Sequence, residues 1–335
     1  MMLLHIYMTS SAQIQVISIV RIHCLIGLVK EVDRMTITAA YRAYVEDRQV
    51  YVAAGTLKTY AGHLKLFFDF LEERYRKDVT ALSFSDTPDN IYSAYILYLR
   101  QKGVKNTTIR SYCRSVKAFL KYCYEEDICQ DYLKKVKLPK DDAAPKMILF
   151  QDEVKKIDDS FDTSTELGLR NYCIFHLMLD CGLRSQEVIH LQVSDILKDR
   201  NVIQILNTKG CKSRLTLIPD FLLRQIDTYL SISGRASGVI FQSMKDRKPM
   251  TSNAIKQLFQ DLKVSSSISR VHAHLLRHTF ATSYLMGGGN LEFLRVFMGH
   301  SDYNVTKTYS QMAAQYKMLG ADVYKLDAIF FSRGY

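Results

Sequence analysis

The sequence predicts a mainly α-helical protein with a small β-sheet, organised as an N-terminal helical domain and a C-terminal α+β domain. Three observations carry this prediction. Residues 36–135 show helical periodicity throughout, with apolar residues recurring every three or four positions. The stretch "KVKLPKDDAAPKM" contains two prolines and indicates an exposed linker. Beyond it, short apolar runs on both sides of "NTKGCK" predict a β-hairpin among further helices.

The expected domain boundaries follow from these patterns. Residues 1–35 are an extension, interpreted as an added helix or as the product of an upstream start codon. Residues 36–136 form the helical domain, 137–148 the linker and 149–335 the second domain. The end of the chain, about 311–335, is expected to be a helix, because it carries an apolar stripe made of Val323, Leu326, Ile329 and Phe330.

Three helices are expected to make up most of the first domain. One starts at Thr56, one has Pro88 near its start and Gly103 at its end, and one opens with Asn106 as its N-cap. The last of these has an apolar face formed by Ile109, Tyr112, Val116, Phe119, Leu120 and Cys123. Its other face carries a basic ridge, defined as Arg110, Arg114, Lys117 and Lys121.

The basic ridge and the overall charge point to a polyanionic partner. The formal net charge is +11, which favours nucleic acid first and an anionic membrane surface second. Solvated helix faces usually mix charges of both signs, so four cations on one stripe favour phosphate contact over simple solvation. Lys58 and Lys65, on the helix expected to start at Thr56, are further candidates for contact with DNA.

Other bulk features narrow the class of protein. The seven cysteines are an odd number without CxxC spacing, which argues against a disulfide framework and a cysteine-zinc module and favours a reducing cytoplasm. The apolar stretch "IQVISIVRIHCLIGLVK" is interrupted by Arg21 and His23 and is too short to span a membrane.

In the second domain, "STELGLRNYCIFHLMLDCGLRSQEVIHL" predicts a buried helix, a turn at Gly182 and a new helix. "NVIQIL" and "SRLTLIP" are the expected strands. "PDFLLRQIDTYL" and "TSNAIKQLFQDL" predict further helices, and the remaining residues are expected to be helical with breaks at 287–290 and near Gly299.

The stretch "HAHLLRHTFAT" concentrates three histidines and one arginine. If residues 274–284 form a helix, a rotation of about 100° per residue places His274 and Arg277 on one face and Leu276 on the opposite, core face. His272 and His278 are expected to have only packing roles. A zinc site using His274 and His278 is disfavoured, because the position of the general base is occupied by a leucine and no further ligands lie nearby.

Other segments supply matching chemistry. Arg184 follows the glycine turn, and Glu187 is placed to orient its guanidinium; an ordinary surface ion pair is the alternative. Lys209 lies at the hairpin tip, where a solvated turn lysine is the alternative, and His300 precedes Tyr309 by nine residues. Without paired carboxylates or a P-loop, these groups suit a phosphodiester: arginines for its oxygens, histidines and lysine for protons, and tyrosine as nucleophile.

With "GLRSQEV", "TKGCKSR", "HLLRHTFAT", "MGH" and "TKTY" in this order, the sequence resembles tyrosine recombinases of the phage-integrase and Xer type over residues 36 to about 320. The resemblance implies a SAM-like core-binding domain and a catalytic domain. It implies that Tyr309 is the nucleophile, and that the activating residues are Arg184, Lys209, His274, Arg277 and His300. The extension before residue 36 does not resemble an arm-binding domain.

The resemblance also implies an activity and partners. The enzyme would form a 3′-phosphotyrosyl bond and a free 5′-hydroxyl and then rejoin strands, without ATP, metal or another cofactor. Its partner would be double-stranded DNA with inverted-repeat core sites, bound by a homo-tetramer on two duplexes or together with a related recombinase. The C-terminal helix would dock in a neighbouring subunit or on its own domain.

The biological role would be integration or excision of a mobile element, or resolution of chromosome dimers, at the nucleoid in the cytoplasm. Three alternatives remain open from the sequence alone: a DNA-binding regulator of the same fold that does not cleave, a topoisomerase of type IB, and a metalloprotein using His274 and His278.

Overall fold

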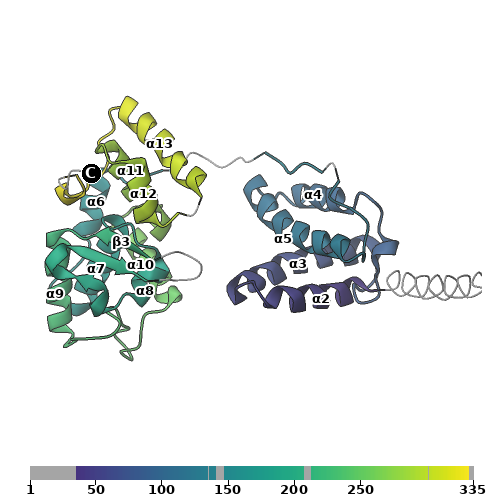
Figure 1. Cartoon of the computed structure of the whole chain (residues 1–335), viewed down its shortest axis with the longest axis horizontal. Coiled ribbons are helices and arrows are strands. Elements are labelled where there is room, and N and C mark those ends of the chain that lie inside the picture. Colours follow the sequence, from purple (N-terminus) through teal and green to yellow (C-terminus); the bar gives the residue numbers. More distant parts are fainter. Residues whose placement is uncertain (1–34, 135, 141–146, 207–212, 301, 332–335) are drawn as a thin grey trace, which may run out of the picture. The chain divides into compact units, whose positions relative to one another are not determined.

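The computed structural model describes residues 35–134, 136–140, 147–206, 213–300 and 302–331. The chain divides into two compact units, Met1–Ala144 and Pro145–Tyr335, which are described separately (Figure 1). The division falls within the expected linker.

The described part of the first unit contains four α-helices and a short 3-10 helix. They are α2 (Ile37–Gln49), α3 (Ala54–Tyr75), η1 (Phe84–Asp86), α4 (Ile91–Gln101) and α5 (Asn106–Glu125). An aromatic core lies between them, in which the Phe67 and Tyr95 rings meet edge to face at 5.1 Å. Helix α5 begins at Asn106 itself and Lys105 holds the N-cap position, so the expected cap is wrong by one residue.

The second unit consists of helices around a small sheet. Its α-helices are α6 (Gln151–Asp158), α7 (Glu166–Leu179), α8 (Ser185–His190), α9 (Asp220–Ile232), α10 (Ser252–Ser265), α11 (Ala273–Met286), α12 (Leu291–Met298) and α13 (Tyr303–Met318). The 3-10 helices are η2 (Val193–Asp195), η3 (Lys198–Arg200) and η4 (Ala328–Phe330). Strands β1 (Ile196–Leu197), β2 (Val202–Ile205) and β3 (Arg214–Leu217) form an antiparallel sheet in sequential order. The hairpin of β2 and β3 confirms the expected strand pair, and β1 adds a short third strand.

Helix α11 occupies a central place in the second unit. It contacts α7 and α12, and α13 lies along it (Figure 1). The turn that the sequence predicts at Gly182 has a φ of 65° and brings the chain from α7 into α8. Phe280 of α11 packs directly on that turn, so the two segments are held together by side-chain packing as well as by the backbone.

The expected helix over about 311–335 is wrong in its bounds. Helix α13 ends at Met318, and Gly320 then adopts a φ of 59°, which terminates the helix. The chain continues in extended form: Val323 forms a bridge with Phe150, and the Gln151 N–H donates to the carbonyl of Asp322 (3.1 Å). The apolar stripe therefore packs on its own domain, with Val323, Leu326 and Phe330 buried.

A buried histidine anchors this C-terminal segment. His176 contacts Asp180 through Nδ1 (2.7 Å) and Asp158 through Nε2 (3.0 Å), and the Tyr324 hydroxyl donates to Asp180 (2.8 Å). Burial alone would lower the pKa of His176, but the hydrogen bonds and charges of the two carboxylates outweigh it and raise this pKa to about 9. The imidazolium thus positions the Asp180 carboxylate, which accepts the hydrogen bond from the Tyr324 hydroxyl.

A buried ion pair ties the sheet to the helices. Arg214 of β3 donates to both carboxylate oxygens of Glu187 in α8, at 2.7 and 2.6 Å, and its Nε donates to the carbonyl of Phe297 at the end of α12 (2.7 Å). The two side chains are 3% and 1% exposed. Because each charge is removed from water, loss of either partner leaves an uncompensated charge in the interior.

We expect Arg214→Met to lower the free energy of unfolding by about 3 kcal/mol, because it leaves the Glu187 carboxylate buried with less compensation. Urea denaturation of the full chain measures this. The double variant Glu187→Leu/Arg214→Met should recover only part of the loss, because it removes the ion pair but also takes from Arg184 and Arg277 the carboxylate that offsets their charges. A single variant as stable as the wild type would contradict the prediction.

We also expect Gly182→Ala to lower the free energy of unfolding by about 2–4 kcal/mol. Its φ of 65° is strained for alanine, and the new Cβ would lie 2.6 Å from Cδ1 of Phe280. Gly234→Ala is the matched control, because Gly234 has a φ of 64° and a Cβ added there would meet open space; the left-handed backbone alone should cost about 1 kcal/mol. Equal losses in thermal or urea unfolding would show that the Phe280 contact is unimportant.

Candidate active site

Glu187 and Arg184 form the first part of the site. The backbone N–H of Arg184 donates to Oε2 of Glu187 (2.7 Å), and Nη1 of Arg184 donates to Oε1 (2.9 Å). Burial alone would raise the pKa of Glu187, but the hydrogen bonds and charge of Arg214 and the contact with the Arg184 backbone lower it. The carboxylate is therefore ionised at neutral pH and fixes Arg184, whose side chain is 33% exposed.

Arg277 lies deeper than Arg184. It comes from α11, is 7% exposed, and donates through Nη1 to the carbonyl of Gly182 and through Nη2 to the carbonyl of Met298. Burial, followed by the charges of Arg184 and Arg214, lowers the pKa of Arg277 to about 9. The guanidinium remains charged at pH 7 and retains N–H groups beyond those two bonds, since an arginine has five.

His300 follows the αL turn at Gly299 and packs beside Arg277. Its Nε2 lies 3.4 Å from Nη2 of Arg277, and its Nδ1 lies 3.0 Å from Oγ1 of Thr306. Burial and the charge of Arg277 lower the pKa of His300 to about 4, so the ring is neutral at pH 7. Because a guanidinium only donates, Nε2 accepts, and Nδ1 carries the proton and donates to Thr306.

Tyr309 of α13 reaches the same place. It is 3% exposed, and its ring stacks on His300 with centroids 6.1 Å apart and an interplanar angle of 10°. Burial raises the pKa of Tyr309, and the charges of Arg277 and Arg184 oppose this rise. The phenol oxygen lies 2.8 Å from Nδ1 of His278. The expectation that His278 only packs is therefore wrong: one residue beyond Arg277, it is rotated toward α13.

The remaining expected residues are placed as follows. His274 lies exposed in the first turn of α11. His272 occupies the N-cap position of that helix, and its Nδ1 donates to the carbonyl of Arg270 (2.6 Å), away from the tyrosine contacts. Lys209 lies outside the described residues. The structure thus brings together Arg184, Glu187, Arg277, His300 and Tyr309.

Two further participants were missed by the sequence reasoning, besides His278. Arg214 shares the Glu187 carboxylate with Arg184, and Thr306 holds the His300 ring. No signal in the sequence marks Arg214, because Arg214 and Thr216 of β3 are buried while Leu215 between them is half exposed. Apolar patterning would have placed the leucine inside.

The basic ridge is not uniform. Arg114 and Lys117 are exposed on α5, as are Lys58 and Lys65 on α3. In contrast, Arg110 donates to the carbonyl of Pro139 (2.8 Å), and Lys121 forms an ion pair with Glu125 (3.3 Å). The two ends of the ridge are therefore partly engaged within the chain.

Among the described residues, no group of three or more His, Cys, Asp or Glu side chains could hold a metal ion. No helix in the described ranges is long and apolar enough to cross a membrane.

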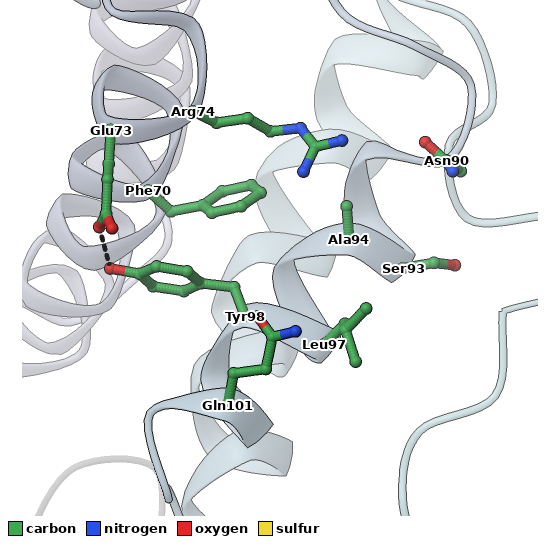
Figure 2. A pocket seen from close by; sticks show the side chains of 9 residues that line it. All are labelled: Phe70, Glu73, Arg74, Asn90, Ser93, Ala94, Leu97, Tyr98 and Gln101. Carbon is green, nitrogen blue, oxygen red and sulfur yellow. Dashed lines mark hydrogen bonds between the residues drawn. The ribbon is translucent and has the colours of Figure 1, made fainter.

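A groove between α3 and α4, lined in part by Phe70 and Leu97, lies in the first unit (Figure 2). Its Tyr98 hydroxyl already donates to Glu73 (2.8 Å).

The arrangement is suited to phosphoryl chemistry. It presents a buried phenol within reach of the charges of Arg184 and Arg277, and Glu187 is the acidic group that counters the charge of Arg277. Guanidinium groups bind the non-bridging oxygens of a phosphodiester, and their charges stabilise a phosphorane and a phenolate alike.

Comparisons with known proteins agree with this geometry. Residues 148–316 match the Phage integrase family, and residues 36–138 match the Phage integrase SAM-like domain. The tyrosine recombinase XerC of Bacillus pumilus (strain SAFR-032) is 26% identical over 281 residues, covering 81% of this chain and 90% of the relative. The tyrosine recombinase XerD of Listeria monocytogenes (serotype 4b, strain F2365) is 25% identical over 283 residues, covering 82% and 92%.

Solved structures share the fold. The Tn1549 transposon integrase in complex with transposon right end DNA has a TM-score of 0.67 at 19% identity, covering 86% of this chain and all of that one. The lambda integrase dimer bound to a COC′ core site has a TM-score of 0.65 at 17% identity, covering 82% and 95%. Because the family match spans half of the chain and the SAM-like match most of the remainder, this chain belongs to the phage integrase family, the tyrosine recombinases, which cleave and rejoin DNA through a tyrosine intermediate.

Proposed function

We propose that this chain is a site-specific DNA recombinase that cuts and rejoins DNA through Tyr309. One observation carries the proposal above the others: the Tyr309 phenol is buried and stacked on His300, within the field of the charges of Arg184 and Arg277. A tyrosine with no role in chemistry gains nothing from a position next to two guanidinium groups that are held by buried partners.

The residues divide the work of one displacement. Arg184 and Arg277 bind the non-bridging oxygens of the scissile phosphate through the N–H groups that their internal partners leave over. His274, exposed at the start of α11, donates a hydrogen bond to the same phosphate, and neutral His300 supports Arg277 and packs on the tyrosine. Glu187 and Arg214 act as positioning residues.

The reaction balances without an external energy source. The Tyr309 oxygen forms a bond to phosphorus and the bond from phosphorus to the 5′ oxygen breaks, giving a 3′-phosphotyrosine. Lys209 donates the proton that the leaving 5′ oxygen takes up. Attack by a 5′-hydroxyl of the partner strand reverses these steps and releases the tyrosine, so the bond energy is conserved.

DNA contact is assigned to both units. Lys58, Lys65, Arg114 and Lys117 are exposed cations of the helical unit, and phosphate contact by such side chains supplies affinity irrespective of sequence. We further propose a tetramer on two duplexes with inverted-repeat core sites, with a related recombinase as an optional partner, acting at the nucleoid. In support, XerH was solved bound to a palindromic difH substrate and lambda integrase as a dimer on a core site.

Integration or excision of a mobile element and resolution of chromosome dimers both remain compatible with this chemistry. The relatives that match in sequence are Xer tyrosine recombinases, and the Tn1549 integrase is that of a transposon. Mapping the DNA joined to Tyr309 around the gene distinguishes them, because a mobile element has ends and a chromosome dimer has one recurring site.

We expect wild-type protein to form a covalent adduct with DNA from the flanks of its gene, and Tyr309→Phe to form none while binding the same DNA, because only the phenol can attack phosphorus. Denaturing gels with nicked substrates measure the adduct. His272→Ala, changed at the helix cap, is the control and should react normally. A wild type that binds its site without any adduct would instead indicate a non-cleaving regulator, and relaxation of plasmids lacking the site would indicate a topoisomerase.

We expect Arg114→Ala to weaken DNA binding on all sequences and to reduce the slope of log K against log salt by about one, because one phosphate contact is lost. Fluorescence anisotropy at several salt concentrations measures the slope. Lys121→Ala is the matched control on the same helix and should change the slope less, since that lysine already forms an ion pair with Glu125. A slope unchanged in Arg114→Ala would assign this part of the ridge to solvent.

A further inference from the structure

The phenol of Tyr309 must lose its proton when it attacks, and the structure limits where that proton goes. This step rests on the proposed function. The arginines around the tyrosine carry no acceptor atom. His300, although it stacks on the ring, has its Nε2 directed at Arg277 and its Nδ1 at Thr306. Neither nitrogen of His300 is therefore the partner of the phenol oxygen.

His278, unlike His300, contacts the phenol oxygen of Tyr309 through a ring nitrogen. Its Nδ1 lies 2.8 Å from the Tyr309 oxygen, and the two rings are tilted by 47° with centroids 5.5 Å apart. This distance is that of a normal O–H···N hydrogen bond and lies within the range needed for direct proton transfer. His278 is partly buried on α11, a helix that also supplies Arg277.

We propose that His278 is a catalytic residue that positions the Tyr309 phenol and accepts its proton during attack on the phosphate. In cleavage, the O–H bond of Tyr309 breaks, the proton moves to Nδ1 of His278, and the bond from oxygen to phosphorus forms as the 5′ oxygen leaves. In religation, the 5′-hydroxyl attacks, the phenolate departs, and the same proton returns from His278.

The electrostatic setting favours proton transfer to His278 over attack by a phenol that keeps its proton. Burial raises the pKa of Tyr309, so a free phenolate is rare at neutral pH. A base in contact with the phenol therefore assists attack by accepting its proton. As the proton leaves, negative charge flows into the phosphorane, which the guanidinium groups of Arg184 and Arg277 stabilise.

The test measures single-turnover cleavage of a nicked substrate by wild type, His278→Ala, His278→Asn and His272→Ala. The asparagine variant keeps a hydrogen-bonding group near the place of Nδ1 but cannot take up a proton. We expect both His278 variants to cleave about 10²-fold more slowly, at unchanged DNA affinity, and His272→Ala to cleave normally. Full rescue by asparagine would overturn proton acceptance, and wild-type rates in His278→Ala would overturn the whole proposal.

A second measurement separates proton acceptance from folding. Replacing Tyr309 with 3,5-difluorotyrosine makes the phenol more acidic and lessens the need for a base. We expect it to speed cleavage by His278→Ala about tenfold and to change the rate with His278 present much less. Equal effects in both backgrounds would overturn the inference. If the wild type itself forms no adduct, the proposed function fails; if it does and the His278 variants match it, only this inference fails.

Discussion

The buried carboxylate of Glu187 is the constraint on which the site depends. It receives hydrogen bonds from Arg184 and Arg214, and it is the acidic group whose charge counters that of Arg277. Three arginines so close together repel one another, and burial strengthens that repulsion. One carboxylate offsets it in part and leaves two positive charges, which suits a phosphodiester whose negative charge grows in the transition state.

The same cluster explains why turns are so important around it. Arg277 satisfies the carbonyls of Gly182 and Met298, so its position is fixed by the turn before α8 and by the end of α12. Gly299, with a φ of 58°, lets the chain turn where a Cβ would lie 3.1 Å from Arg214. The positions of the guanidinium groups therefore depend on the backbone of these two turns, and a distortion of either turn would displace the charges.

The sequence predicted the parts of this architecture that depend on local patterns. Helical periodicity located α11 and the core position of Leu276, and the glycine turn located Arg184 beside Glu187. It failed where tertiary contacts decide. Arg214 is buried in β3 while its neighbour Leu215 is half exposed. His278 gains its partner from α13, and the residues after Gly320 exchange helical bonds for contacts with Leu149 and Gln151. None of these partners is close in sequence.

A site built from arginine charge has a consequence for its bases. Burial, followed by the charges of Arg277, Arg184 and Arg214, lowers the pKa of His300 to about 4, because the field that favours phosphate and phenolate penalises a further cation. A histidine close to Arg277 is therefore neutral and serves as a hydrogen-bonding and stacking group. A proton acceptor has to contact the phenol oxygen, as Nδ1 of His278 does, and its positive charge forms while the phosphorane gains negative charge. Tyr309 contacts two histidines whose partners differ: the nitrogens of His300 face Arg277 and Thr306, whereas Nδ1 of His278 contacts the phenol oxygen.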